Sequence, residues 1–153
     1  MRIGITGATG FLGRPLVRAL CARGDAVVVF SRDPARAKRS LPVGAEARSL
    51  DAITGETFSG LDAVVNLAGE PVADGRWDER RKRAIRESRV ETTRAVVNAI
   101  ERASPRPRAL VNASGVGYYG PRGEEVVTEG ERPGTDFLAE VCRAWEDEAE
   151  RAT

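Results

Sequence analysis

The chain reads Gly7-Ala8-Thr9-Gly10-Phe11-Leu12-Gly13 directly after the short apolar run Ile3-Gly4-Ile5-Thr6, and an amphipathic segment from Phe11 to Arg23 follows. This order predicts a strand, a glycine-rich turn and a helix. Such a turn places unpaired backbone N–H groups and the positive end of a helix dipole where they can bind a diphosphate. The glycines suit the task, because one permits the tight turn, one admits the phosphates and one lets the helix pack closely on the strand.

A dinucleotide is the ligand that this turn indicates, against the alternative of an ordinary glycine-rich turn between a strand and a helix. We expect the cofactor to be contacted by residues of the turn and of the first helical turn, namely Gly7, Thr9, Gly10, Phe11, Leu12 and Gly13.

The composition fits one globular domain over residues 1–153, with 41% hydrophobic and 31% charged residues. The net charge of +1 gives no bulk electrostatic attraction to nucleic acid or to a membrane surface. No apolar run approaches the ~20 residues of a membrane-spanning helix. The first strand begins at once, so no signal peptide is predicted and a cytoplasmic location is expected.

Two residue types restrict the chemistry. The chain has no histidine, which excludes histidine acid–base catalysis and most zinc sites, so no metal is expected. Cys21 and Cys142 lie far apart in helical patterns and are expected to be reduced thiols. Any chemistry must therefore use hydroxyls, carboxylates, amides or a bound cofactor.

Apolar strand patterns and amphipathic helix patterns alternate along the chain. Besides the first strand and helix, we expect strands at 26–31, 45–50, 63–68 and 109–114, and helices at 34–38, 78–103 and 136–153. This alternation predicts an α/β fold, a doubly wound parallel sheet with helices on both faces. Because the chain stops within a periodic helix, we expect a fragment truncated after the fifth strand and the following helix, without a carboxy-terminal substrate-binding part.

The second strand ends in Phe30-Ser31-Arg32. An acidic residue at this point would hydrogen-bond the adenosine ribose and select NAD. An arginine can instead meet a 2′-phosphate through a charge-assisted contact, to which Ser31 can add a hydroxyl. The sequence thus favours NADP over NAD. Asp33 is a competing ribose contact, although a helix cap is the favoured interpretation, and Arg36 is expected on a solvated helix face.

Two further segments follow strands at the edge where ligands bind in open α/β sheets. Asp51 could accept a hydrogen bond from the adenine amino group, or it could simply form a turn. In Asn66-Leu67-Ala68-Gly69, small residues let the backbone run beside the cofactor, so we expect contacts from Leu67, Ala68 and Gly69.

The fifth strand leads into Ser114-Gly115-Val116-Gly117-Tyr118-Tyr119-Gly120. A serine hydroxyl and a tyrosine phenol beside a nicotinamide could polarise a substrate carbonyl and exchange its proton. Ser114, Tyr118 and Tyr119 are therefore candidate catalytic residues, and Ser114 is also a candidate cofactor contact. The alternative is a glycine-rich loop whose tyrosines pack beneath a further domain.

Several motifs together resemble an atypical branch of the extended short-chain dehydrogenase/reductases, the NAD-dependent epimerase/dehydratase or nucleoside-diphosphate-sugar epimerase type. They are Thr6–Gly13, Asn66–Pro71, Ser88–Arg94, Gly117–Gly120 and Phe137–Glu146. The resemblance implies a Rossmann fold that carries NAD(P), and a longer protein whose carboxy-terminal part binds substrate. It also implies oxidation of a sugar carbon by the nicotinamide, with hydride returned to the opposite face.

In that superfamily a Ser or Thr and a Tyr-x-x-x-Lys pair perform the proton chemistry, whereas the corresponding helix here reads Phe137-Leu138-Ala139-Glu140-Val141-Cys142. Glu140 could substitute as an acid/base, against the alternative of a surface glutamate. When the superfamily pattern is aligned with this sequence at Tyr119-Gly120, its serine corresponds to Gly115, and Ser114 lies one position before it.

Two functions follow from these observations. The first is an NADP-dependent epimerase, dehydratase or reductase that acts on a nucleotide-sugar-like or small carbonyl substrate. The second is a non-catalytic NADP sensor or interaction module. A nucleic-acid role for the basic segment Arg76–Arg94 is disfavoured, because acidic residues interleave there at helical spacing. The resemblance also implies homodimers that pair through the long helices.

Overall fold

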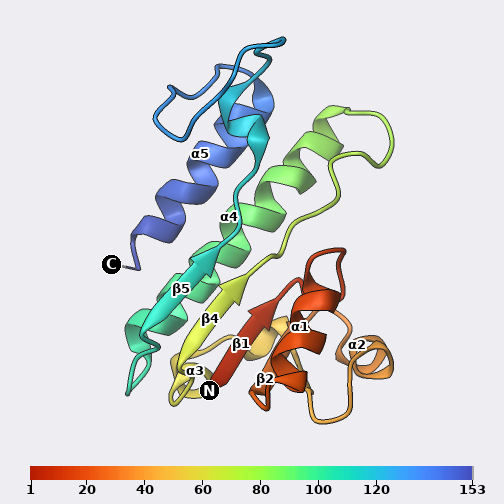
Figure 1. The fold of residues 1–153 in the computed structure, drawn as a ribbon, viewed down its shortest axis with the longest axis vertical. Helices are drawn as coiled ribbons and strands as arrows, with labels where there is room; N and C mark the ends of the chain where they lie inside the picture. Colours follow the sequence, from red (N-terminus) through yellow and green to blue (C-terminus); the bar gives the residue numbers. More distant parts are fainter. Residues whose placement is uncertain (153) are drawn as a thin grey trace.

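The computed structural model describes residues 1–152, whose five parallel strands form one sheet in the order β3-β2-β1-β4-β5 (Figure 1). The strands are β1 (Arg2–Thr6), β2 (Ala26–Ser31), β3 (Glu46–Ser49), β4 (Ala63–Asn66) and β5 (Ala109–Asn112). The chain winds outward from β1 in one direction to β3 and in the other to β5. The predicted doubly wound α/β fold, a Rossmann arrangement, is confirmed, and its crevice is expected at the carboxyl ends of β1 and β4.

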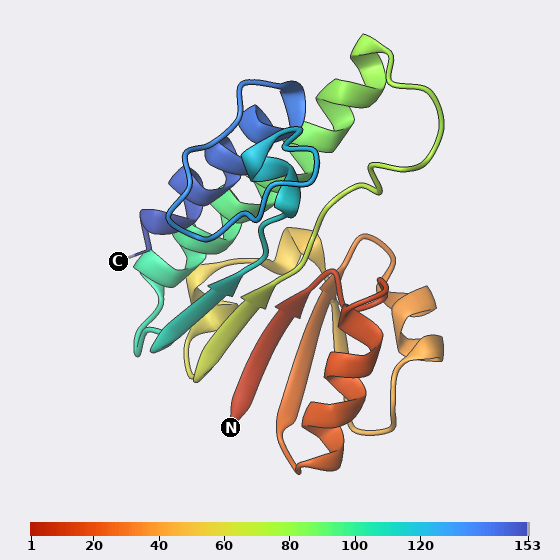
Figure 2. The ribbon, with the colours of Figure 1, turned by 45° about the horizontal axis from the view of Figure 1, so that its top comes forward.

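Helices cover both faces of this sheet (Figure 2). They are α1 (Gly13–Ala22), α2 (Pro34–Ser40), α3 (Gly55–Phe58), α4 (Glu79–Arg102) and α5 (Phe137–Glu150), with short 3-10 turns η1 (Leu50–Ala52) and η2 (Val116–Tyr119). α1 and α2 lie on one face, and α3, α4 and α5 lie on the other.

The apolar run of β2 explains how one strand supports two cores. Val27 and Val29 pack with Val17 and Leu20 of α1, whereas Val28 and Phe30 join the opposite core of α3 and α4. Alternate side chains of a strand point to opposite faces, so a strand covered on both sides must be apolar throughout.

Several boundaries differ from the sequence prediction. The fourth and fifth strands end at Asn66 and Asn112, because the small residues after them leave the sheet and form loops at its carboxyl edge. α1 begins at Gly13, and the Phe11 side chain before it is 93% exposed. The unpredicted α3 is a four-residue turn closed by a Thr54–Thr57 capping box. The predicted last helix reaches residue 153, which lies outside the described residues, and α5 ends at Glu150.

A buried polar network fixes the carboxyl ends of the central strands. Thr6 Oγ1 donates to Asn66 Oδ1 at 2.5 Å, while Asn66 Nδ2 donates to Thr93 Oγ1 of α4 at 2.8 Å and to Asn112 Oδ1 at 2.6 Å. One amide thus joins β1, β4, β5 and α4, and its hydrogen bonds offset the cost of burying it.

Among the described residues, no helix combines the length and apolarity that crossing a membrane requires. Within 1–152 there is also no group of three or more Cys, Asp or Glu side chains placed to hold a metal ion.

Candidate functional site

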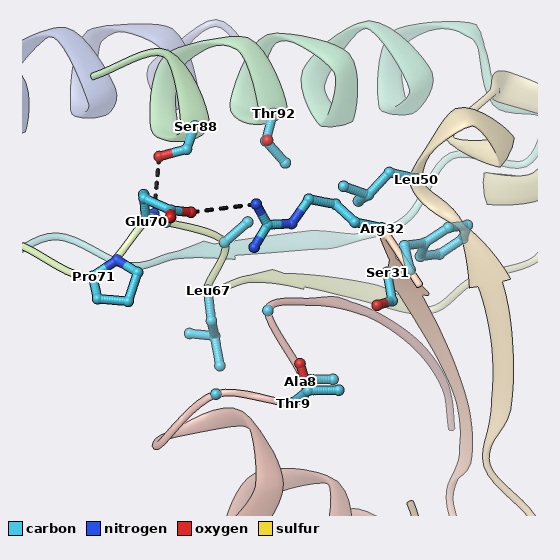
Figure 3. A pocket seen from close by; sticks show the side chains of 15 residues that line it. Ala8, Thr9, Ser31, Arg32, Leu50, Leu67, Glu70, Pro71, Ser88 and Thr92 are labelled. Carbon is cyan, nitrogen blue, oxygen red and sulfur yellow. Dashed lines mark hydrogen bonds and ion pairs between the residues drawn. The ribbon is translucent and has the colours of Figure 1, made fainter. Parts of the chain in front are cut away.

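A cleft of about 440 Å³ opens at the carboxyl ends of β1, β2 and β4 (Figure 3). Eight of the residues predicted to bind the cofactor line it, and they are Gly7, Thr9, Gly10, Ser31, Arg32, Leu67, Ala68 and Gly69. They come from three loops that are separate in the sequence. The topology therefore brings the predicted contacts to one place.

The glycine-rich turn is sterically specified. Gly7 has φ of +68°, and a Cβ added there would lie 2.4 Å from the carbonyl oxygen of Leu67. A Cβ on Gly13 would come equally close to the carbonyl oxygen of Gly7, so this glycine lets α1 pack against the turn. Both positions thus need glycine for close backbone approach, the property that also leaves room for a phosphate.

The amino terminus of α1 differs from those of the other long helices. Asp33, Asp78 and Asp136 cap α2, α4 and α5, each accepting a hydrogen bond from a backbone N–H. The N-cap of α1 is Leu12, which makes no side-chain cap, and the first turn holds no acidic residue. The helix therefore presents its N–H groups and positive dipole end to the turn, an arrangement that fits a bound anion.

Arg32 reaches across the cleft toward α4 (Figure 3). Its Nη1 donates to Glu70 Oε2 at 3.3 Å, and Arg81 contacts the other Glu70 oxygen at 3.4 Å. Ser88 Oγ accepts from the Glu70 backbone N–H at 2.9 Å and so holds the loop against α4. The Arg32 side chain is 80% exposed, so its ion pair is worth about 0–1 kcal/mol and a ligand can displace it.

Three guanidinium groups surround a second hollow, of about 410 Å³, which shares Thr9, Ser31 and Arg32 with the cleft. Its other lining residues are Arg14, Asp33, Arg36, Ala37 and Ser40. Arg36 was expected on a solvated helix face, and it does lie exposed, but beside this hollow. Asp33 caps α2 by accepting from the Arg36 N–H at 2.8 Å, as the favoured interpretation held. Three hydroxyls and three guanidinium groups here suit a phosphate.

Some predicted cofactor contacts lie elsewhere. Phe11 and Leu12 are exposed before α1, and Gly13 packs against the backbone of Gly7 and Ala8 without lining the cleft. Asp51 sits in η1, where its backbone N–H and carboxylate both bond Ser49 Oγ. Its neighbour Leu50 is the residue of this turn that lines the cleft.

The cleft also contains residues to which the sequence assigned no role, namely Ala8, Phe30, Leu50, Glu70, Pro71, Ser88 and Thr92. Ser88 and Thr92 are four residues apart, so they share one face of α4. The spacing of the two hydroxyl residues could have indicated that they line the cleft, but only with the knowledge that α4 passes the ends of β1 and β4. Glu70 and Pro71 directly follow the segment Leu67–Gly69, which was predicted to contact the cofactor.

A separate pocket of about 360 Å³ lies beyond β5, lined by Ser114, Gly115, Val116, Tyr118, Tyr119, Glu129 and Glu146. Ser114 Oγ donates to Glu146 Oε1 of α5. The rings of Tyr118 and Tyr119 meet edge to face, with centroids 5.1 Å apart. The predicted catalytic residues Ser114, Tyr118 and Tyr119 are therefore together, whereas Ser114 does not line the cofactor cleft.

Glu140, the fourth catalytic candidate, is exposed in the first turn of α5 and is not among the residues that line this pocket. Glu146 lines it instead, and no feature of the sequence read alone singled Glu146 out. Close approach of η2 to α5 makes the contact possible, because a Cβ on Gly117 would lie 3.0 Å from Leu138 Cβ.

Cys142 contacts Gly115 of the Ser114 pocket, and Arg89 contacts Glu70 of the cleft. Burial raises the pKa of the Cys142 thiol, and the negative charge of Glu146 adds to the effect. Burial lowers the pKa of Arg89, whose Nη1 donates to the Glu70 carbonyl at 3.0 Å while its guanidinium stacks 5.2 Å from the Trp145 ring. Arg89 thereby connects the wall of the cleft to α5.

The sequence profile of the NAD dependent epimerase/dehydratase family matches residues 3–139. The chain is 40% identical to the epimerase family protein SDR39U1 homolog, chloroplastic, of Arabidopsis thaliana, over 99% of this chain and 45% of that protein. It is 34% identical to the epimerase family protein YfhF of Bacillus subtilis, over 98% of this chain and 50% of that protein. The chain spans about half the length of the curated relatives it matches.

Solved structures agree with these matches. The crystal structure of human epimerase family protein SDR39U1 (isoform 2) with NADPH superposes with a TM-score of 0.83 at 34% identity, covering 97% of this chain and 48% of that one. The nucleoside-diphosphate sugar epimerase from Corynebacterium glutamicum superposes with a TM-score of 0.77 at 33% identity, covering 99% and 31%.

Proposed function

Because the chain belongs to the NAD dependent epimerase/dehydratase family, we propose that it binds NADP in the cleft between β1 and β4. We further propose that it forms the cofactor-binding part of an enzyme acting on a nucleotide-sugar-like or small carbonyl substrate. The observation that carries the first proposal is the uncapped amino terminus of α1 above a turn that only glycine can form. Bound NADP would supply a hydride acceptor or donor.

The adenosine end is assigned by charge. The diphosphate lies over Gly7–Gly10, and the 2′-phosphate enters the hollow between Arg14, Arg32 and Arg36. Arg32 then exchanges its weak pairing with Glu70 for a doubly charged phosphate. The NADPH in the human relative's crystal structure supports this choice over NAD.

The reacting end is assigned by position. β4 and β5 pair in parallel, with Asn66 opposite Asn112, so the loops that carry Ala68 and Ser114 leave neighbouring strands at the same edge of the sheet. A nicotinamide that follows Leu67–Gly69 would therefore approach the polar groups of the Ser114 pocket. Ser114, Tyr118 and Tyr119 can bind and orient a substrate hydroxyl or carbonyl there. The nucleoside-diphosphate sugar epimerase among the structural relatives supports a nucleotide sugar as substrate class.

One observation favours a second function. α5 carries neither a tyrosine nor a lysine, the pair that the resemblance leads one to expect, so a non-catalytic NADP-binding module remains the alternative. Reduction of bound NADP by the alcohol group of a nucleotide sugar would exclude that alternative.

Titration calorimetry of NADP and NAD tests the cofactor proposal. Wild type should bind NADP more tightly than NAD. Arg32→Ala should weaken NADP binding by about tenfold to hundredfold, the contribution of a hydrogen bond between charged groups. NAD binding should change little. Arg39→Ala, an exposed arginine of α2 outside the hollow, is the matched control. Equal affinity of wild type for both nucleotides would overturn the assignment of the 2′-phosphate.

A further inference from the structure

The hydrogen bond between Ser114 and Glu146 joins the loop after β5 to α5 inside a solvent-accessible pocket. Ser114 Oγ is the donor and Glu146 Oε1 the acceptor, so the serine proton points to the carboxylate while the serine oxygen retains lone pairs that can accept a proton from a ligand. Both side chains line the pocket, together with Tyr118 and Tyr119. A carboxylate that orients a hydroxyl toward a cavity is the arrangement of a general base and its relay.

The neighbours of Glu146 leave it without a cationic partner in the recorded contacts of residues 1–152. The acidic groups nearby are Glu129, which also lines the pocket, and the buried thiol of Cys142, whose Sγ lies 3.7 Å from the Gly115 carbonyl oxygen. Arg89 stacks on Trp145, and its guanidinium bonds backbone carbonyls of Glu70 and Ile85. By contrast, Glu148, two residues further along α5 and not part of the pocket lining, is bound by Arg94 at 3.0 Å. Glu146 thus differs from a structural ion-pair carboxylate.

We propose that Glu146 is the catalytic acid/base of this site and Ser114 its proton relay, in place of a tyrosine–lysine pair. The proposal rests on the proposed function and identifies the substrate class as a secondary alcohol and its ketone. The substrate O–H proton passes to Ser114 Oγ as the serine proton passes to Glu146 Oε1. Bound NADP would supply the hydride acceptor, so that the C–H hydrogen could leave with both bonding electrons as the C=O bond forms. Return of hydride and proton regenerates the alcohol.

The position of the pair relative to the cofactor cleft supports this role. Ser114 follows β5 two residues after Asn112, and the cleft residue Ala68 follows β4 two residues after its partner Asn66. The N–H of Ala113 donates to the Asn66 carbonyl at 2.9 Å, which holds the two exits together. Adjacent strands lie about 4.8 Å apart. A substrate carbon facing the cleft can therefore present its oxygen to Ser114.

The test uses the full-length protein and three variants, Glu146→Gln, Ser114→Ala and Asp147→Asn. Asp147 is the matched control, because it is the next residue of α5, is exposed and does not line the pocket. The first readout is binding of NADP by calorimetry, which should stay within about twofold for Glu146→Gln and Asp147→Asn, since neither residue lines the cleft. The second is reduction of NADP by nucleotide sugars, which Glu146→Gln should slow by about 100-fold or more.

A third readout, the binding of a nucleotide sugar, does not depend on turnover. Glu146→Gln should retain nucleotide-sugar affinity in the presence of NADPH, because the amide still accepts the serine hydrogen bond. Glu146→Asp should restore part of the rate. The proposal would be overturned if the Glu146→Gln variant catalysed reduction of NADP at the wild-type rate. It would also be overturned if the wild type bound NADP but no secondary alcohol of this class reduced the bound NADP. Failure of wild type to bind NADP would instead overturn the proposed function itself.

Discussion

The two sides of the carboxyl edge of the sheet are built differently. At the cleft between β1 and β4, backbone geometry makes the site, through a left-handed Gly7, a close-packed Gly13 and an uncapped helix. At the Ser114 pocket, two side chains that are 32 residues apart make the site, through one hydrogen bond between the loop after β5 and α5. A site made by the backbone tolerates changes of side chain but not of glycine, whereas a site made by side chains should lose chemistry before it loses structure.

Gly7→Ala should produce the largest effect. The added Cβ would collide with the Leu67 carbonyl, and the residue would be held at positive φ. The free energy of unfolding should fall by about 2–5 kcal/mol, as measured by urea denaturation.

Gly24→Ala is the matched control for that change. Gly24 also has positive φ, at +88°, but nothing lies within 4 Å of its added Cβ. The loss should be about 1–2 kcal/mol, from backbone strain alone. Equal losses for the two variants would contradict a close backbone approach at Gly7.

Asn66→Leu should come next, because Asn66 joins the two regions. Its replacement leaves Thr6, Thr93 and Asn112 without their shared partner, at a cost of about 2–4 kcal/mol in the free energy of unfolding. Thr93→Val removes a single acceptor and should cost about 1 kcal/mol. The contrary outcome is a leucine variant as stable as wild type in thermal and urea melts, which would show that the network contributes nothing net.

Arg36→Ala should have a smaller effect that is confined to NADP. Arg36 is an exposed member of the hollow beside the cleft, so its loss should weaken NADP by about two- to fivefold and leave NAD unchanged. Raising the ionic strength should diminish the difference, since exposed charges are screened. An equal loss for NAD would place the effect outside 2′-phosphate recognition.

The pKa of the Cys142 thiol offers the finest test of the second region. Burial raises this pKa first and the negative charge of Glu146 second, while the Ser114 hydroxyl lowers it. Removing the charge stabilises the thiolate, so Glu146→Gln should lower the pKa of Cys142, and Ser114→Ala should raise it. Thiolate absorbance in a Cys21→Ser background measures both. Shifts of the opposite sign would show that Ser114 and Glu146 do not act on the pKa of Cys142 in this way.

The sequence was sufficient where the structure is local. The strand, turn and helix around Gly7–Gly13, the buried run of β2 and the Asp33 cap all follow from residues close in the chain. Strand ends were extended to residues 68 and 114, because small or apolar residues continue into loops that line the sites. α3 was missed because four residues carry no helical period.

The pairing of Ser114 with Glu146 could not be predicted in the same way. Glu140 was chosen for its place in the helix where the superfamily's tyrosine and lysine are expected, yet the tertiary packing of η2 on α5 brings a different glutamate to the serine. Such a contact depends on how Gly117 lets the loop approach Leu138, which no local pattern specifies. Arg32 lines the cleft, and its partner Glu70 lies in the loop after β4, a contact that the sequence alone did not predict.

A crystal structure of the protein with NADP would test the central claim most directly. We expect the diphosphate over the glycine-rich turn at the start of α1, and the 2′-phosphate bound by Arg32, which will have left Glu70. The nicotinamide should lie beyond Leu67–Gly69, facing Ser114. NADP bound at another place, or Arg32 still paired with Glu70 in a fully occupied complex, would contradict the account.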